Sequence, residues 1–246
     1  MKYIIKGQQP PELIAIHKGK DANGKHYTYS AVSDDKTKNK TIYTDTLASL
    51  IQEQGSICCY CMQFIDINSH SSIKPTIEHY IPQNPEDYKN LEKKKKLYHD
   101  KLGTKYQNML ATCHGNDKLD PDNKYCDKSK GNQFLKFLNP LDVSAEIVLG
   151  YGRDGSIVCL DDLKKVEVKK DIKTLNLNFQ KLKDARKSII EAVQKSIIIE
   201  KKRERNRLKN KFNKDEFKQK ELAKCQMKNG KFKPYVQVMI YELNKI

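Results

Sequence analysis

The chain has 246 residues and carries 47 lysines and arginines against 31 aspartates and glutamates, which gives a formal net charge of +16. No stretch approaches the ~18 apolar residues that a membrane-spanning helix needs, and the apolar run at the N-terminus is too short for a signal peptide. We therefore expect a cytoplasmic protein of one large or two small domains whose natural partners are anions, with nucleic acid foremost.

Residues 1–56 predict a short β element followed by a helix. Asn23-Gly24 is typical of a hairpin turn, because both residues tolerate a positive φ. The helix after it can be capped by Thr44 or Asp45, and Gly55 suits the left-handed residue that ends a helix.

Residues 57–142 differ in character, being rich in cysteine, histidine and asparagine. Cys58 and Cys61 form a C-x-x-C pair, in which two thiolates from one tight turn can reach a single zinc ion. Cys113 and Cys126 are the obvious second pair. Four thiolates would complete a closed, tetrahedral structural zinc site.

The second cysteine pair is the less specific one, because twelve residues separate its members. His114 or Cys59 can replace one of them as a ligand, and a redox pair or unrelated buried thiols are the alternatives to zinc. In a reducing compartment an odd number of cysteines favours metal binding over disulfides. We expect ordinary thiols at the two remaining positions, Cys159 and Cys225.

Between the cysteine pairs lies the sequence Ile77-Glu78-His79-Tyr80-Ile81-Pro82. A histidine flanked by apolar residues is by itself more often structural than catalytic. Next to a carboxylate, however, it pairs a hard oxygen ligand for a cation with a base whose ordinary pKa lies near neutral pH. Metal-assisted hydrolysis of a phosphodiester needs both groups.

Two later pieces complete the pattern, residues 106–110 (YQNML) and residues 126–131 (CDKSKG). In chain order, C-x-x-C, E-H-x-x-P, N-x-L and C-D-x-x-K-G resemble the motifs of the HNH endonuclease family, over Cys58 to about Asp142. Within that family the sequence is most similar to the nucleases of retron-associated and Septu-type anti-phage systems, through residues 77–82 and 130–140.

The resemblance implies an α+β fold, in which a ββα-metal module with a structural zinc knuckle is flanked by short β elements and a mostly helical, basic C-terminal region. It implies His79 as the general base and Asn108 as the residue that keeps this histidine aimed. Glu78 and Asp127 would bind a catalytic ion, with Asn132 as the alternative to Asp127. Two oxygen ligands favour Mg²⁺ or Mn²⁺ at this position.

The function that the resemblance implies is metal-dependent hydrolysis of DNA by the effector nuclease of an anti-phage defence system, together with an ATPase partner. Two alternatives stay open from the residues alone. One is a zinc-stabilised nucleic-acid-binding module without nuclease activity, and the other is a nuclease that acts on RNA.

Residues 143–246 predict a hairpin and then helix. Residues 147–151 and 156–160 flank the turn sequence Arg153-Asp154-Gly155. From Leu175 onward apolar residues recur at three- and four-residue steps or their multiples, which predicts an amphipathic helix that continues into the basic C-terminal segment.

The excess of positive charge is concentrated near the C-terminus. Residues 201–233 hold 14 basic and 4 acidic side chains, whereas residues 1–200 hold 32 and 26. We expect this segment to contact phosphates or an acidic partner, through Lys201, Lys202, Arg203, Arg205 and Arg207. Lys128 and Lys130 could steady a phosphate oxygen, although solvation at the surface is the commoner role.

Overall fold

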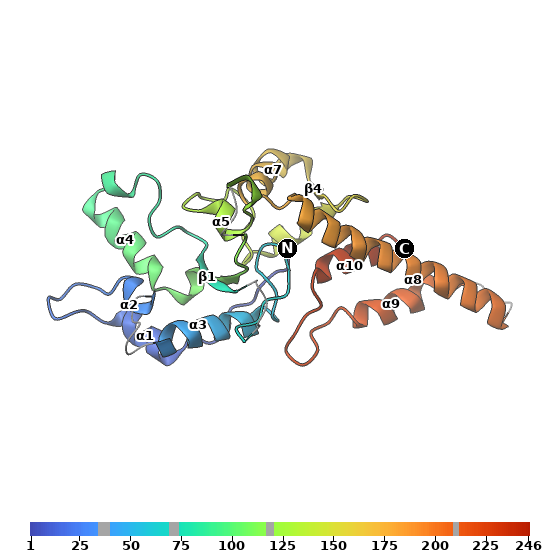
Figure 1. Ribbon diagram of the computed structural model, residues 1–246, viewed down its shortest axis with the longest axis horizontal. Coiled ribbons are helices and arrows are strands. Elements are labelled where there is room, and N and C mark those ends of the chain that lie inside the picture. The colour runs from blue at the N-terminus through green and yellow to red at the C-terminus, as the bar shows by residue number, and fades with distance from the viewer. Residues whose placement is uncertain (34–39, 69–73, 117–120, 209–211) are drawn as a thin grey trace.

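The computed structural model describes residues 1–33, 40–68, 74–116, 121–208 and 212–246. Helices dominate, and two small antiparallel sheets of two strands each lie among them, which confirms the expected α+β class. The N-terminal helices gather at one end of the molecule and the C-terminal helices at the other, with the first sheet between them (Figure 1).

The N-terminal region is helical, and the predicted β element is reduced to a single bridge between Lys20 and His26. Gly24 between them does turn the chain with a φ of 74°. The prediction was wrong about what surrounds this turn, because Pro11 starts a helix at a position where proline's missing N–H costs nothing. The helices here are α1 (Pro11–Lys18), α2 (Ser30–Ser33) and α3 (Lys40–Glu53).

Helix α3 begins earlier than predicted, and it ends just before Gly55, whose φ of 62° is left-handed as expected. The side chain of Gln54 then fixes the neighbouring strand. Its amide nitrogen donates to the carbonyls of Ile57 (2.9 Å) and Ala111 (2.8 Å), and its amide oxygen accepts the N–H of Ala111 (2.7 Å). One buried side chain therefore joins α3 to the centre of the molecule.

The first sheet pairs β1 (Thr76–His79) with β2 (Met109–Thr112), and Glu78 lies opposite Leu110 in the antiparallel register. Between the strands the chain forms α4 (Lys93–Gly103). A one-turn helix, α5 (Asp127–Lys130), follows the last of the four candidate zinc cysteines.

The predicted C-terminal hairpin is confirmed as β3 (Leu149–Tyr151) paired with β4 (Ile157–Cys159), after the short helix α6 (Val143–Ile147). The helix expected from Leu175 is confirmed as α8 (Gln180–Leu208), which begins five residues later than expected, and a separate helix that was not expected precedes it, α7 (Lys165–Thr174). The break between the two helices lies at Asn176, whose left-handed φ of 45° is incompatible with a continuing helix.

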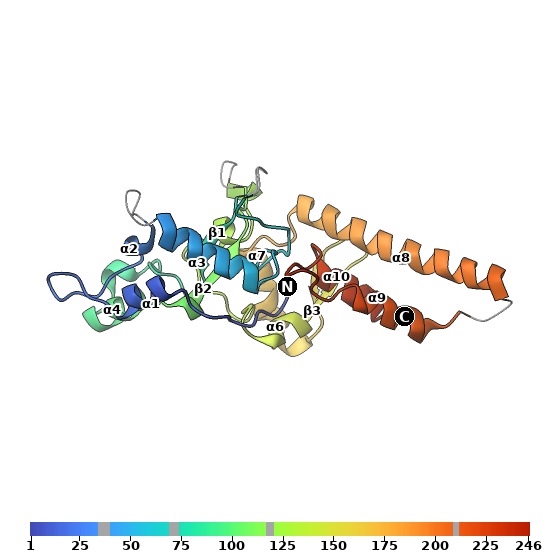
Figure 2. The ribbon, with the colours of Figure 1, turned by 90° about the horizontal axis from the view of Figure 1, so that it is seen from below.

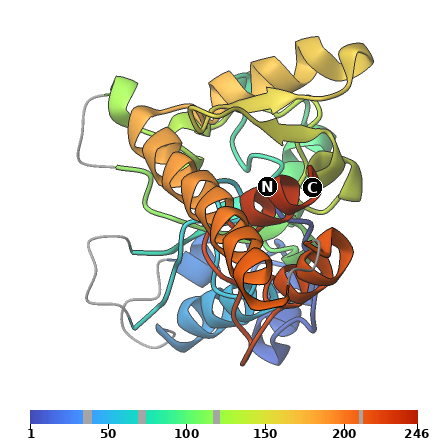
Figure 3. The same cartoon turned by 90° about the vertical axis from the view of Figure 1, so that its right-hand side faces the viewer.

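Helix α8 runs outward from the body of the molecule, and the chain then folds back through α9 (Lys214–Ala223) and α10 (Val236–Leu243) (Figure 2). Helix α10 lies beside α8 (Figure 3), and its Val236 and Val238 are fully buried. Within the described parts of the chain, no helix is both long and apolar enough to cross a membrane.

Candidate metal centre and candidate active site

Four cysteine sulfurs meet at one point in the interior. Cys58 and Cys61 come from the turn after α3, Cys113 follows β2, and Cys126 precedes α5. Their Sγ atoms all lie within 4.8 Å of one another. The Sγ atoms of Cys58 and Cys126 are 3.9 Å apart, and those of Cys61 and Cys113 are 3.7 Å apart.

This spacing fits a tetrahedral zinc ion. A Zn–S bond of ~2.3 Å places two sulfurs of a tetrahedron about 3.8 Å apart, and no sulfur of the set is open to solvent. Burial alone would raise the pKa of the Cys58 thiol, but hydrogen bonds from Cys113 and Cys126 hold it well below its ordinary value. A buried group of four cysteines that could hold a structural metal such as zinc is therefore present.

The two ends of the long loop between Cys113 and Cys126 are joined by a backbone hydrogen bond. The N–H of Tyr125 donates to the carbonyl of Gly115 at 3.1 Å, which brings the two ends of the loop together. Gly115 has a φ of 55°, and a Cβ added there would lie 2.1 Å from the Tyr125 carbonyl oxygen. Only glycine fits this close approach. The alternative ligands, Cys59 and His114, lie outside the four-sulfur group.

The candidate active site lies where the first sheet meets α5. Glu78 and His79 end β1, whereas Asp127 and Lys130 begin and end α5. The short helix is fixed at its start, because the N–H of Cys126 donates to the Leu175 carbonyl at 2.8 Å. The strand β1 and the short helix α5 thus bring Glu78, His79, Asp127 and Lys130 into one neighbourhood.

Glu78 is buried, with 4% of its surface exposed, and it is the centre of a polar group. Its Oε1 accepts a hydrogen bond from the Tyr60 hydroxyl at 2.8 Å and lies 2.8 Å from the Lys130 ammonium. Burial raises the pKa of Glu78 to about 8, Lys130 opposes this shift, and the nearby carboxylate of Asp127 adds to it. Glu78 and Asp127 are therefore neighbours within this polar group.

His79 is held at both ring nitrogens. Its Nε2 lies 2.9 Å from the Gly103 carbonyl oxygen, which can only accept, so Nε2 carries the proton and Nδ1 carries the lone pair. The Gln83 amide nitrogen lies 2.8 Å from that Nδ1. The ring of Tyr29 packs against the imidazole edge-on, with 4.5 Å between centroids. Burial lowers the pKa of His79 to about 4, so the imidazole is neutral at neutral pH.

The side chain of Asn108 holds the backbone around His79 through hydrogen bonds. Its Oδ1 accepts the Ile81 N–H at 2.8 Å, and its Nδ2 donates to the carbonyls of Ile81 (2.9 Å) and Leu102 (3.2 Å). These bonds fix the segment after His79 to the end of α4, whose Gly103 holds the imidazole. Asn108 is thus placed as a positioning residue. Asn132, the alternative metal ligand, lies beyond α5 with an exposed side chain.

Lys130 corrects a sequence-based expectation. It was expected at the surface or on a substrate phosphate, but only 1% of it is exposed, because its ammonium pairs with Glu78 and donates to the His79 carbonyl at 3.0 Å. Lys128 is half-buried. On α8 the side chains of Lys201, Lys202 and Arg203 are exposed. The side chains of the two further candidates, Arg205 and Arg207, lie outside the part of the chain that the structure describes.

Four neighbours of the candidate site were not expected from the sequence: Tyr29, Tyr60, Gln83 and Gly103. Tyr60 lies within the C-x-x-C segment, and Gln83 directly follows the E-H-x-x-P motif, so both were adjacent to recognised motifs. Nothing in the sequence marks Gly103, because it contributes a backbone carbonyl from the far end of α4.

A comparison with protein-family models finds no match to this chain, and a comparison with curated proteins finds none either.

Proposed function

We propose that the chain is a metal-dependent endonuclease of the HNH type that hydrolyses phosphodiester bonds in DNA. One observation carries the proposal: two carboxylates and a neutral imidazole, supplied by β1 and α5, converge beside a closed group of four cysteines. The order of the motifs along the chain supports the same conclusion.

The donor set fits the proposed cation. Carboxylate oxygens are ligands that Mg²⁺ and Mn²⁺ prefer, and Glu78 and Asp127 supply two of them. Glu78 is paired with Lys130, and a divalent cation bound there would favour the ionised carboxylate against the burial that raises the pKa of Glu78. A divalent ion held there would polarise the scissile phosphate and stabilise the leaving 3′ oxygen.

The protein's own groups then have distinct tasks. His79 accepts the proton of the attacking water at Nδ1, while its Nε2–H remains on the Gly103 carbonyl and keeps the ring oriented. Gln83 must turn away first, because its amide occupies the lone pair of Nδ1. Asn108 holds the backbone on either side of this arrangement.

The test is nicking of supercoiled plasmid with Mg²⁺ or Mn²⁺ by the wild type and His79→Ala. We expect the substitution to lower the rate by about a hundredfold or more, the usual contribution of a general base. His26→Ala, outside the candidate site, serves as the control. Equal zinc content and equal melting temperatures must be established for all three proteins.

A second function is favoured by the pairing of the site residues themselves. Glu78 is neutralised by Lys130 and both nitrogens of His79 are engaged, which suits a zinc-stabilised nucleic-acid-binding module without nuclease activity. If wild type and His79→Ala bind DNA equally and neither cuts DNA or RNA, with the neighbouring gene product present, the second function is correct and the first is wrong.

The defence role with an ATPase partner is part of the same proposal. Helix α8 supports it, since it extends from the body of the molecule (Figure 2) and carries more basic than acidic side chains along its length. Co-purification with the product of the adjacent gene, followed by nuclease assays with and without nucleotide, tests this role.

A further inference from the structure

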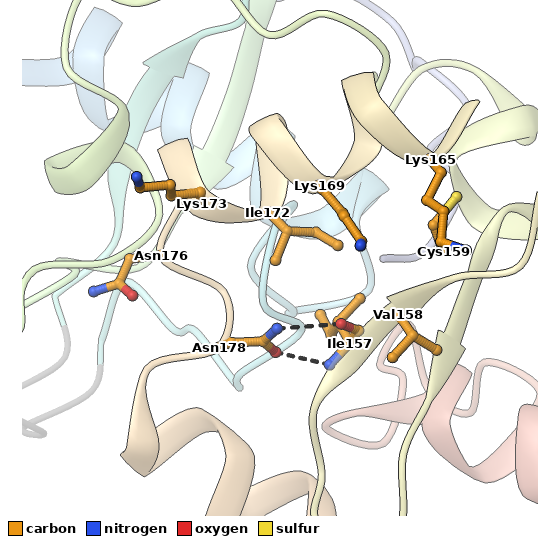
Figure 4. A pocket seen from close by; sticks show the side chains of 9 residues that line it. All are labelled: Ile157, Val158, Cys159, Lys165, Lys169, Ile172, Lys173, Asn176 and Asn178. Carbon is orange, nitrogen blue, oxygen red and sulfur yellow. Dashed lines mark hydrogen bonds between the residues drawn. The ribbon is translucent and has the colours of Figure 1, made fainter. Parts of the chain in front are cut away.

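A cavity of about 660 Å³ lies between α7 and β4, away from the groups assigned to catalysis (Figure 4). Its volume falls within the range of small-molecule sites, about 300–1,000 Å³. One wall is α7, the opposite wall is β4, and the turn between α7 and α8 closes one end. None of the residues that line the cavity contributes to the four-cysteine group or to the candidate active site.

The helical wall carries three positive charges. Lys165, Lys169 and Lys173 follow one another at four-residue intervals, which places them on one face of α7. Lys165 pairs with exposed Asp162 at 2.7 Å. Among the described residues, the side-chain ammonium groups of Lys169 and Lys173 have no ion-pair or hydrogen-bond partner. Like charges at this spacing repel one another, so an anion that binds between them would relieve the repulsion.

The rest of the cavity is apolar and held in place. Ile172 and Ile157 are buried and form its floor, whereas Val158 is 41% exposed at its edge. The side chain of Asn178 accepts the N–H of Ile157 at 2.7 Å and donates to the carbonyl of the same residue at 3.1 Å, as Figure 4 shows. The hairpin is thereby fastened to the turn before α8, and the cavity is formed in advance of any ligand.

We propose that this cavity binds a nucleoside phosphate. Phosphate oxygens match the ammonium groups of Lys169 and Lys173, and the apolar floor fits the face of a nucleobase. An inorganic anion would leave the floor unused, and an aliphatic ligand would leave the lysines unpaired. The proposal does not depend on the nuclease function, since it uses none of the same side chains.

A ligand bound in the cavity could also influence the candidate active site, because the residues that follow Lys173 contact the α5 region. Thr174 and Leu175 follow Lys173, and their carbonyls accept the Ser129 hydroxyl (2.8 Å) and the Cys126 N–H (2.8 Å). Cys126 directly precedes α5 and Ser129 lies within it, and the same helix carries Asp127. A ligand that binds the Lys173 ammonium therefore contacts the residue directly before Thr174, whose carbonyl helps to position this helix.

The experiment is calorimetric titration of the zinc-loaded, full-length protein with ATP, GTP, CTP and UTP, each alone. Lys169→Gln/Lys173→Gln should weaken the binding of at least one of them about tenfold or more. The control is Lys170→Gln/Lys181→Gln, which removes the same charge from exposed lysines outside the cavity and should leave affinity unchanged. Val158→Glu places a carboxylate at the edge of the cavity and should abolish binding.

Four results would overturn the proposal. The first is that none of the four nucleotides binds at millimolar concentration, and the second is that the control weakens binding as much as the cavity variant. The third comes from competition: pyrophosphate that binds as tightly as the nucleotides would show that the apolar floor is not used. The fourth is that a single-stranded oligonucleotide displaces the nucleotides and that its affinity falls more than theirs in Lys169→Gln/Lys173→Gln. The surface would then bind nucleic acid, and the small-ligand assignment would be wrong.

Discussion

At the scale of single residues, the four cysteines differ from the other thiols in what surrounds each sulfur. Cys61 lies 3.7 Å from another sulfur in a buried group, whereas Cys159 is half-buried and contacts a backbone carbonyl. Spacing along the chain suggested this division. The distances between Sγ atoms establish which four cysteines share a site, and Cys59, adjacent to Cys58, is excluded by them.

Cys61→Ser should lower the zinc content of the purified protein and its melting temperature, because three thiolates and a hydroxyl make a weaker structural site. Metal analysis by mass spectrometry and thermal unfolding measure the two effects. Cys159→Ser should change neither. Equal zinc content in Cys61→Ser and wild type would contradict the assignment of the zinc site.

Asn108 makes three hydrogen bonds to backbone groups from a buried side chain. Asn108→Ala should lower the free energy of unfolding by about 1–3 kcal/mol, since it leaves buried backbone groups unpaired. Under the proposed nuclease function it should also lower the nicking rate of the folded protein, because the segment after His79 loses its support. Urea unfolding measures the first effect, with exposed Asn23→Ala as the control, for which we expect no change.

At the scale of elements, the loop that closes between Gly115 and Tyr125 decides whether Cys113 and Cys126 meet. A Cβ at position 115 would lie 2.1 Å from a carbonyl oxygen, whereas one at Gly24 would meet nothing within 4 Å. Both glycines have a positive φ, so the comparison separates the collision from the cost of the backbone conformation.

Gly115→Ala should therefore destabilise the protein more than Gly24→Ala, which carries only the backbone cost of about 1 kcal/mol. The first variant should also bind zinc more weakly, since its loop cannot close without displacing Tyr125. Unfolding in urea and competition for zinc with a chromogenic chelator measure the two effects. Equal destabilisation by the two substitutions would show that the loop yields without strain.

At the scale of the whole molecule, positive charge and candidate chemistry are separated. Lys201, Lys202 and Arg203 belong to the last turns of α8, whereas the candidate site residues belong to β1 and α5. Figure 1 shows the outer end of α8 far from both of these elements. Truncation after Lys201 would be a poor test of this surface, because it also removes the buried residues of α10. Replacement of the charges leaves that packing intact.

Substitution of Lys201, Lys202 and Arg203 by glutamine should weaken DNA binding and reduce the slope of log affinity against log salt by up to about 3, roughly one for each lost phosphate contact. The control replaces Lys93, Lys94 and Lys95 of α4, which are also exposed. Filter binding over a range of salt concentrations measures the slope. A loss of affinity with an unchanged slope would show that these residues do not contact phosphate.

The sequence by itself determined the chemical content of the molecule: the order of the metal-binding motifs, the hairpin at residues 149–159, and the basic C-terminal segment. Local spacing is sufficient for such features, because turn residues and C-x-x-C pairs act over a few positions. The tertiary structure decided the rest. It buried Lys130 against Glu78, placed Gln83 on His79, and delayed the start of the predicted helix to Gln180, beyond the left-handed residue Asn176. These outcomes depend on contacts between segments distant in the chain and on desolvation, which neither periodicity nor composition records.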